Sequence, residues 1–179
     1  MAVQVALFRG INVGGSGVLP MKELVAVLEA VGCRNVHTYI QSGNAVFTSD
    51  AGAARLTKKI RAEINRRRGF EPKVLLLTRR DIERAMAKNP FPEATDEPKL
   101  LHLGFLSGAP GRAAVASLER LRAPEEQYRV IGSVLYLHLP AGAGRSRLAA
   151  GAEKALGVPM TVRNWRTVCK VHEMAAALD

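Results

Sequence analysis

Three short polar segments of this chain carry the residue types that could bind or act on a small molecule. The first is glycine-rich and covers residues 9–17, the second covers 41–44, and the third covers 163–170. Glycine lets backbone amides approach an anion closely, and arginines in the first and third segments add positive charge. These segments predict a site for a small anionic, nucleotide-like ligand. Its expected binding residues are Arg9, Gly10, Asn12, Gly14, Gly15, Gln41, Ser42, Asn44, Arg163, Asn164 and Arg166.

Each segment also has a purely structural explanation. Residues 9–17 lack the Gly-Lys-Ser/Thr of a P-loop and the glycine spacing of a dinucleotide fingerprint, so their glycines could simply serve a turn. Residues 41–44 are typical turn formers. Asn164 suits a helix cap, although cations near that helix start are disfavoured by the helix dipole unless an anion or an acidic group neutralises them. Both explanations stay open.

An enzyme is a further alternative. Arg9 and Arg163 could act as electrophilic donors while Ser42 or Asn44 orients a substrate, but no general base stands out and Ser42 has no visible His–Asp pair. The histidines have no metal-ligand spacing, so we expect no metal and no cofactor. They are His37, His102, His138 and His172.

The elements that must position these segments follow from hydrophobic periodicity. The first half predicts strands near 3–8, 36–41, 44–48 and 72–77 and helices over 20–31 and 53–68, with a short helix over 78–86. The second half repeats the order, with strands near 100–106, 127–131, 134–139 and 160–163, helices over 112–122 and 145–156, and a last helix after Asn164. We therefore predict an α+β fold of two ferredoxin-like βαββαβ halves packed together, with a C-terminal helix. The expected boundaries are 1–88 and 99–179, with a linker over 89–98.

This topology predicts where the polar segments meet. The first and third strands are central neighbours in a βαββαβ sheet, so residues 9–17 and 41–44 are expected at the same end of it. The repeat is expected to bring Arg163 and Asn164 close as well.

Strand alternation in the first half predicts two different sheet faces. We expect Val3, Val5 and Leu7 beneath the helices, which leaves Phe8 and Phe47 on the opposite face. An exposed aromatic face would resemble the base-stacking surface of RNA-recognition modules. Burial of that face is the favoured alternative, because apolar area gains about 25 cal/mol per Å² when it leaves water.

Composition narrows the class of protein. Of 179 residues, 47% are hydrophobic and 23% are charged, which indicates a globular chain with a sizeable core. The net charge of +10 would attract phosphates, and the helix over 53–68 is strongly basic, so nucleic-acid binding is an alternative to a solvated helix face. Two cysteines are too few for a disulfide framework. With no signal peptide and no long apolar run, we expect a cytoplasmic protein without membrane contact.

Three stretches together resemble the bacterial family of domain of unknown function (DUF) 1697. They are Phe8–Gly15 (FRGINVGG), Tyr39–Asn44 (YIQSGN) and Arg163–Val168 (RNWRTV), and Asn89-Pro90-Phe91 is similar as well. The resemblance spans nearly the whole chain and implies a two-part α+β fold with no established activity. It marks the residues of the three segments and gives no role to Cys169, where similar sequences usually carry another residue. A structural interaction module without a ligand therefore also stays open.

Overall fold

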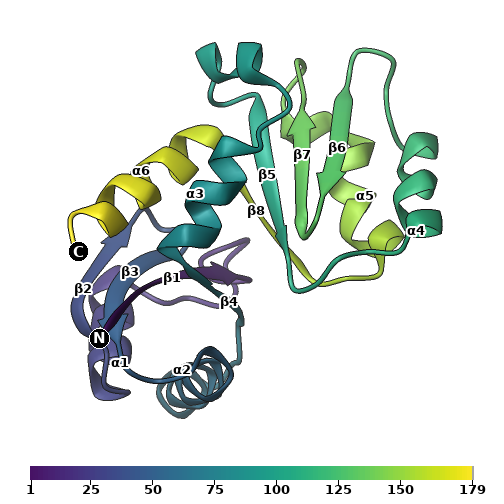
Figure 1. Cartoon of the computed structure of the whole chain (residues 1–179). Coiled ribbons are helices and arrows are strands. Elements are labelled where there is room, and N and C mark those ends of the chain that lie inside the picture. Colours follow the sequence, from purple (N-terminus) through teal and green to yellow (C-terminus); the bar gives the residue numbers. More distant parts are fainter. Residues whose placement is uncertain (179) are drawn as a thin grey trace. The chain divides into compact units, whose positions relative to one another are not determined.

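The computed structural model describes residues 1–178 and divides the chain into two compact units. Unit 1 comprises Met1–Glu83 together with the C-terminal segment from Lys170, and unit 2 comprises Arg84–Cys169. Each unit holds one four-stranded antiparallel sheet with its helices (Figure 1). The predicted α+β fold class is confirmed, including both βαββαβ halves and the C-terminal helix.

Unit 1 follows the expected order along the chain. Its elements are β1 (Ala2–Arg9), α1 (Met21–Ala30), β2 (Arg34–Tyr39), β3 (Asn44–Ser49), α2 (Ala53–Arg68) and β4 (Lys73–Thr78). The sheet has the order β2-β3-β1-β4, and Leu7 of β1 lies opposite Asn44 of β3. The end of β1 therefore lies beside the start of β3, which brings residues 10–20 and 40–43 to the same end of the sheet.

Helices α1 and α2 cover the face of the unit 1 sheet opposite to the one predicted. Phe8 and Phe47 are fully buried in one cluster with residues of α1 and α2, such as Leu24 and Ile60. The prediction that Val3, Val5 and Leu7 lie beneath these helices was therefore wrong, and an exposed aromatic platform is excluded. Alternation separates two faces but does not say which one a helix covers when both are apolar. Burial of Phe8 and Phe47 is the outcome that the area argument predicted, and Val5 and Leu7 on the other face are buried too.

Two helix starts follow their sequence signals closely. α3 (Arg79–Ala87) begins after Thr78, whose amide donates to Asp81 Oδ2 at 2.8 Å while the Asp81 amide donates to Thr78 Oγ1 at 3.2 Å. These two reciprocal bonds form a capping box. α6 (Trp165–Ala176) begins after Asn164, whose Oδ1 accepts the Thr167 amide at 2.9 Å.

Unit 2 repeats the order with a sheet arranged β6-β7-β5-β8. Its elements are β5 (Leu101–Leu106), α4 (Arg112–Ser117), β6 (Gln127–Ile131), β7 (Val134–His138), α5 (Arg147–Leu156) and β8 (Met160–Asn164), with short 3-10 turns η1 (Pro92–Asp96), η2 (Leu118–Arg120) and η3 (Ala143–Arg145). The predicted strands near 127–131 and 134–139 form a hairpin about Gly132-Ser133, and Gly132 has the positive φ of 59° that its tight turn needs. β6 is an edge strand, because it pairs with β7 alone.

No helix within residues 1–178 is both long and apolar enough to cross a bilayer. The longest helix, α2, has 16 residues and a basic C-terminal turn.

Candidate functional site

Asn12 joins the two polar loops of unit 1. Its Nδ2 donates to the carbonyl oxygens of Leu19 and Gln41, both at 2.9 Å, and its Oδ1 accepts the Leu19 amide at 2.8 Å. Residues 10–20 and 40–43 are thus held together by one side chain, and we call them the loop pair. The predicted approach of these segments is borne out by this geometry.

Asn44 and Gly43 fasten the second loop to β1. Asn44 is 1% exposed, and its Nδ2 donates to the Tyr39 carbonyl at 2.9 Å and to Ser42 Oγ at 3.2 Å. The Phe8 amide donates to the Gly43 carbonyl at 2.8 Å. A Cβ on Gly43 would lie 2.4 Å from Ile11 Cδ1, so glycine is required there. Asn44 is therefore a structural residue of the hairpin.

The glycines of the first loop build a small hairpin of their own. The Ser16 amide donates to the Val13 carbonyl at 3.1 Å, and Gly14 and Gly15 occupy the turn with φ of 58° and 77°. Both values suit the tight turn that joins paired strands. The turn is exposed, and the space that a Cβ would occupy at either glycine is empty. The amides of this tip are therefore accessible to a ligand.

Two cationic residues lie at the strand ends beside the loop pair. Arg9, the last residue of β1, lies opposite Lys73 of β4, and both residues are exposed. Residues directly opposite in a sheet present their side chains on the same face, so the side chains of Arg9 and Lys73 lie next to each other on one face of the sheet. Gly10, Gln41 and Ser42 are exposed at the same end of unit 1.

The third predicted segment forms the end of β8 and the start of α6, and all of it except Lys170 belongs to unit 2. Arg163 is half-buried, and its Nη1 donates to the Val162 carbonyl at 2.9 Å. Burial lowers the pKa of Arg163 to about 10, so this guanidinium is still charged at neutral pH. Asn164 caps α6, and Arg166 is exposed while its amide donates to the Pro98 carbonyl at 3.4 Å.

Both cysteine thiols have a raised pKa. Burial raises the pKa of the Cys33 thiol to about 11, and burial also raises that of Cys169, so both stay protonated at neutral pH. Within residues 1–178, no group of three His, Cys, Asp or Glu side chains is arranged to hold a metal ion.

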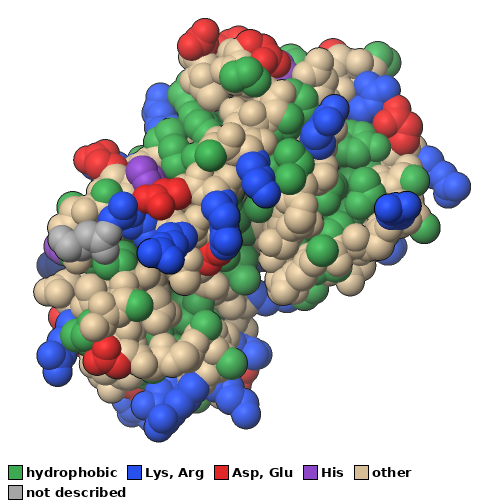
Figure 2. All heavy atoms as spheres, viewed as in Figure 1, with side chains coloured by type: hydrophobic (Ala, Val, Ile, Leu, Met, Phe, Trp, Pro, Cys, Tyr) green, Lys and Arg blue, Asp and Glu red, His purple; other side chains and the backbone are tan. Residues whose placement is uncertain are grey.

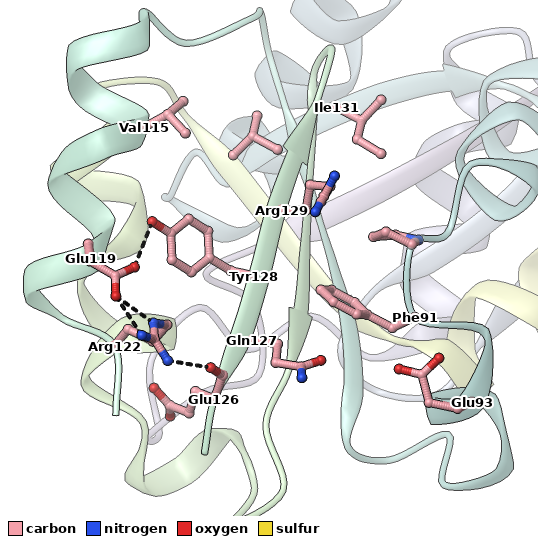
Figure 3. Close-up of a pocket in the computed structure, with 12 residues that line it drawn as sticks. Phe91, Glu93, Val115, Glu119, Arg122, Glu126, Gln127, Tyr128, Arg129 and Ile131 are labelled. Atoms are coloured by element: carbon pink, nitrogen blue, oxygen red, sulfur yellow. Dashed lines mark hydrogen bonds and ion pairs between the residues drawn. The ribbon is translucent and has the colours of Figure 1, made fainter. Parts of the chain in front are cut away.

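A groove in unit 2 has no counterpart among the sequence predictions. It has a volume of about 830 Å³ and follows the edge strand β6. In Figure 3, Val115 and Glu119 lie on one side of this strand, while Phe91 and Glu93 lie on the other. These walls come from separate parts of the chain, so no local pattern could reveal the groove. The position of β6 at a sheet edge was the one available signal.

Fold and site together define a two-unit α+β protein with a polar loop pair and an open sheet edge. The family model described as "Protein of unknown function (DUF1697)" matches residues 1–136, and the chain belongs to this family. The chain is also similar to a solved structure, the conserved bacterial protein SP0830 from Streptococcus pneumoniae. The two share 26% sequence identity with a TM-score of 0.72, over 97% of this chain and 98% of that one. No match is found among curated proteins.

Proposed function

We propose that this chain is a cytoplasmic protein that binds a small anionic, nucleotide-like ligand at the loop pair. The observation that carries the proposal is the Asn12 side chain, which holds residues 10–20 and 40–43 in one fixed arrangement. A site that is already ordered loses less conformational entropy when its ligand binds.

The exposed groups around Asn12 have the right chemistry for an anion. The amides of Gly14 and Gly15 can donate to phosphate oxygens, and Arg9 beside Lys73 supplies positive charge. Gln41 and Ser42 add polar groups that could orient a ligand. Asn12 and Asn44 support this arrangement from behind rather than contact the ligand, because their side chains are already bonded to the chain.

A thermal-shift screen tests this proposal. Purified protein is heated with inorganic phosphate, sulfate and common nucleotides at low and moderate salt. A ligand at 100 times its dissociation constant should add about 2.7 kcal/mol of stability. We expect Arg9→Gln to abolish the shift, and Arg34→Gln, which removes an exposed cation at the far end of β2, to preserve it. No shift with any anion, or equal loss in both variants, contradicts the proposal.

Nucleic-acid binding through α2 is a second candidate function. The residues Arg55, Lys58, Lys59 and Arg66 are exposed and share one side of the helix, opposite the buried Leu56, Ile60 and Ile64. Figure 2 shows Lys and Arg side chains gathered on the part of unit 1 where Figure 1 places α2. Ion pairs reduce the effect, because Glu63 bonds to both Arg66 and Arg67.

The salt dependence of binding separates this candidate from the first. Phosphate contacts release counterions, so affinity for RNA or DNA should fall steeply as salt rises. Lys58→Gln/Lys59→Gln should weaken binding, whereas Lys88→Gln/Lys99→Gln, with the same loss of charge in unit 2, should not. Affinity that is insensitive to salt, or equal effects of the two double variants, contradicts the candidate.

A further inference from the structure

Strand β6 leaves part of its backbone without a neighbouring strand. The Leu106 amide donates to the Ser133 carbonyl, and the Leu139 amide donates to the Leu100 carbonyl, both at 2.9 Å. Backbone hydrogen bonds from β7 therefore alternate between its two neighbours. Residues 133, 135, 137 and 139 form hydrogen bonds with β5, and residues 134, 136 and 138 form them with β6.

The same alternation fixes which groups of β6 point outward. Residues 127, 129 and 131 lie opposite 138, 136 and 134, so they carry the hydrogen bonds to β7. The N–H and C=O groups of Tyr128 and Val130 point away from the sheet instead. Within residues 1–178, no hydrogen bond to these four backbone groups is formed.

The outward groups stop at the start of the strand. The Glu126 amide donates to the Ala123 carbonyl at 3.1 Å, and the Glu126 carbonyl accepts Arg122 Nη1 at 3.1 Å. The chain thus satisfies its own backbone before β6 but leaves Tyr128 and Val130 open within the groove. We propose that a short extended peptide pairs antiparallel with β6 and becomes the fifth strand of the unit 2 sheet.

The groove also indicates the composition of that peptide. Side chains of adjacent strand residues point to opposite faces. On one face, Tyr128 and Val130 pack against the core of unit 2, and Val115 lies on the same side of the strand as Tyr128 (Figure 3). Peptide side chains opposite Tyr128 and Val130 enter this face, so they are apolar.

The other face carries an exposed cation, Arg129, between Gln127 and Ile131. Arg129 forms no ion pair with the described residues, whereas Arg122 of the same groove is bonded to Glu119 at 2.6 Å. The peptide residue opposite Arg129 is therefore acidic. Glu93 lies towards the Gln127 end of the groove (Figure 3). Its negative charge would repel an acidic side chain of the peptide there, so the preferred acidic position is the one beside Arg129. The resulting partner is an apolar–acidic–apolar segment.

A second copy of the chain fits this edge poorly. The two-fold pairing that uses the outward groups of both Tyr128 and Val130 places Arg129 directly opposite the Arg129 of the copy. Like charges in directly opposite positions destabilise a sheet. Charge complementarity thus favours a separate acidic peptide over self-pairing.

Fluorescence anisotropy with labelled peptides and the full chain tests this inference. The probe is acetyl-Ser-Val-Glu-Val-Ser-amide, and its matched control has Lys in place of Glu. We expect saturable binding that is about tenfold tighter for the Glu peptide, as one charge contact can provide. Arg129→Glu should reverse the preference. Absence of saturable binding, or equal affinity for both peptides, overturns the proposal.

Two matched changes test strand addition itself. Val130→Pro removes an outward N–H without removing a hydrogen bond to β7. Val130→Thr is the matched control, because it keeps that N–H. We expect peptide binding to be about tenfold weaker for the proline variant only. On the peptide, N-methylation of both Val amides should abolish binding, while N-methylation of the Glu amide, which points away from β6, should preserve it. These two methylated peptides test strand addition even if Val130→Pro does not fold. Equal effects of the two methylations, or a concentration-dependent dimer that Arg129→Glu leaves intact, overturn the proposal.

Discussion

The two units of this chain share one topology but differ in the loops that connect their strands and in their edge strands. In unit 1, residues 10–20 connect β1 to α1 and residues 40–43 connect β2 to β3, whereas unit 2 uses only 107–111 and the tight turn 132–133 for the equivalent connections. Unit 1 has an irregular edge strand, with a shift in register between Arg34 and His37, while β6 of unit 2 is regular. The same fold therefore offers polar loops in one unit and an open sheet edge in the other.

The largest effect should come from Phe47, which marks the helix-covered face of unit 1. Phe47→Ala is expected to destabilise the chain by about 3–5 kcal/mol, because it removes a fully buried aromatic ring. Urea unfolding followed by circular dichroism measures this change. A loss below about 1 kcal/mol would instead indicate an exposed ring and would contradict the assignment of this face.

The two hairpins should differ in their tolerance of a side chain. Gly43→Ala should cost about 3 kcal/mol, because its Cβ meets Ile11 and Phe8 in addition to the strain of a φ of 84°. Gly132→Ala has open space around its Cβ and should cost about 1 kcal/mol through φ alone. The same urea experiment compares them, and equal losses would mean that the loop pair is not tightly packed against β1.

The Asn12 contacts should have a smaller effect. Asn12→Ala removes three hydrogen bonds at a partly exposed position and should cost about 2 kcal/mol, compared with about 1 kcal/mol for Ser146→Ala, which removes the N-cap of α5 in unit 2. Asn12→Asp, which keeps the acceptor for the Leu19 amide, should lie between Asn12→Ala and the unaltered chain. Unfolding midpoints in urea provide the measurement. An Asn12→Ala midpoint equal to that of the unaltered chain would show that this side chain does not hold the loops.

Surface carboxylates should give the smallest, pH-dependent effect. Hydrogen bonds from Arg66 and then Arg67 lower the pKa of Glu63 to about 2, and Arg122 lowers that of Glu119 in unit 2. Because the folded pKa lies below the unfolded one, this stabilisation is present above about pH 4.5 and is lost as the pH falls towards 2. Glu63→Gln should therefore lower the melting temperature slightly at pH 7 and leave it unchanged near pH 2. An equal change at both pH values would exclude the ion pairs as its cause.

Sequence patterns predicted the elements of this fold well because they depend on local chemistry. The capping box at Thr78 and Asp81, the Asn164 cap and the turn at Gly132 all require particular residues at particular spacings. The prediction of which face of the unit 1 sheet lies beneath α1 and α2 was wrong, because both faces are apolar. Contacts between residues far apart in the sequence were predicted only in part, because local patterns carry no information about them. Strand order predicted that the loops of unit 1 meet, but no local pattern specified that Asn12 would bond to Gln41.

The central claim is that the loop pair of unit 1 is an anion site. Its most direct test is an NMR titration of the uniformly ¹⁵N-labelled 19.3 kDa chain, first with inorganic phosphate and then with ATP. We predict saturable shifts of the Gly14, Gly15 and Ser42 amides that are absent in Arg9→Gln. Shifts confined to α2, or no shifts in residues 10–20 and 40–43, would contradict the claim.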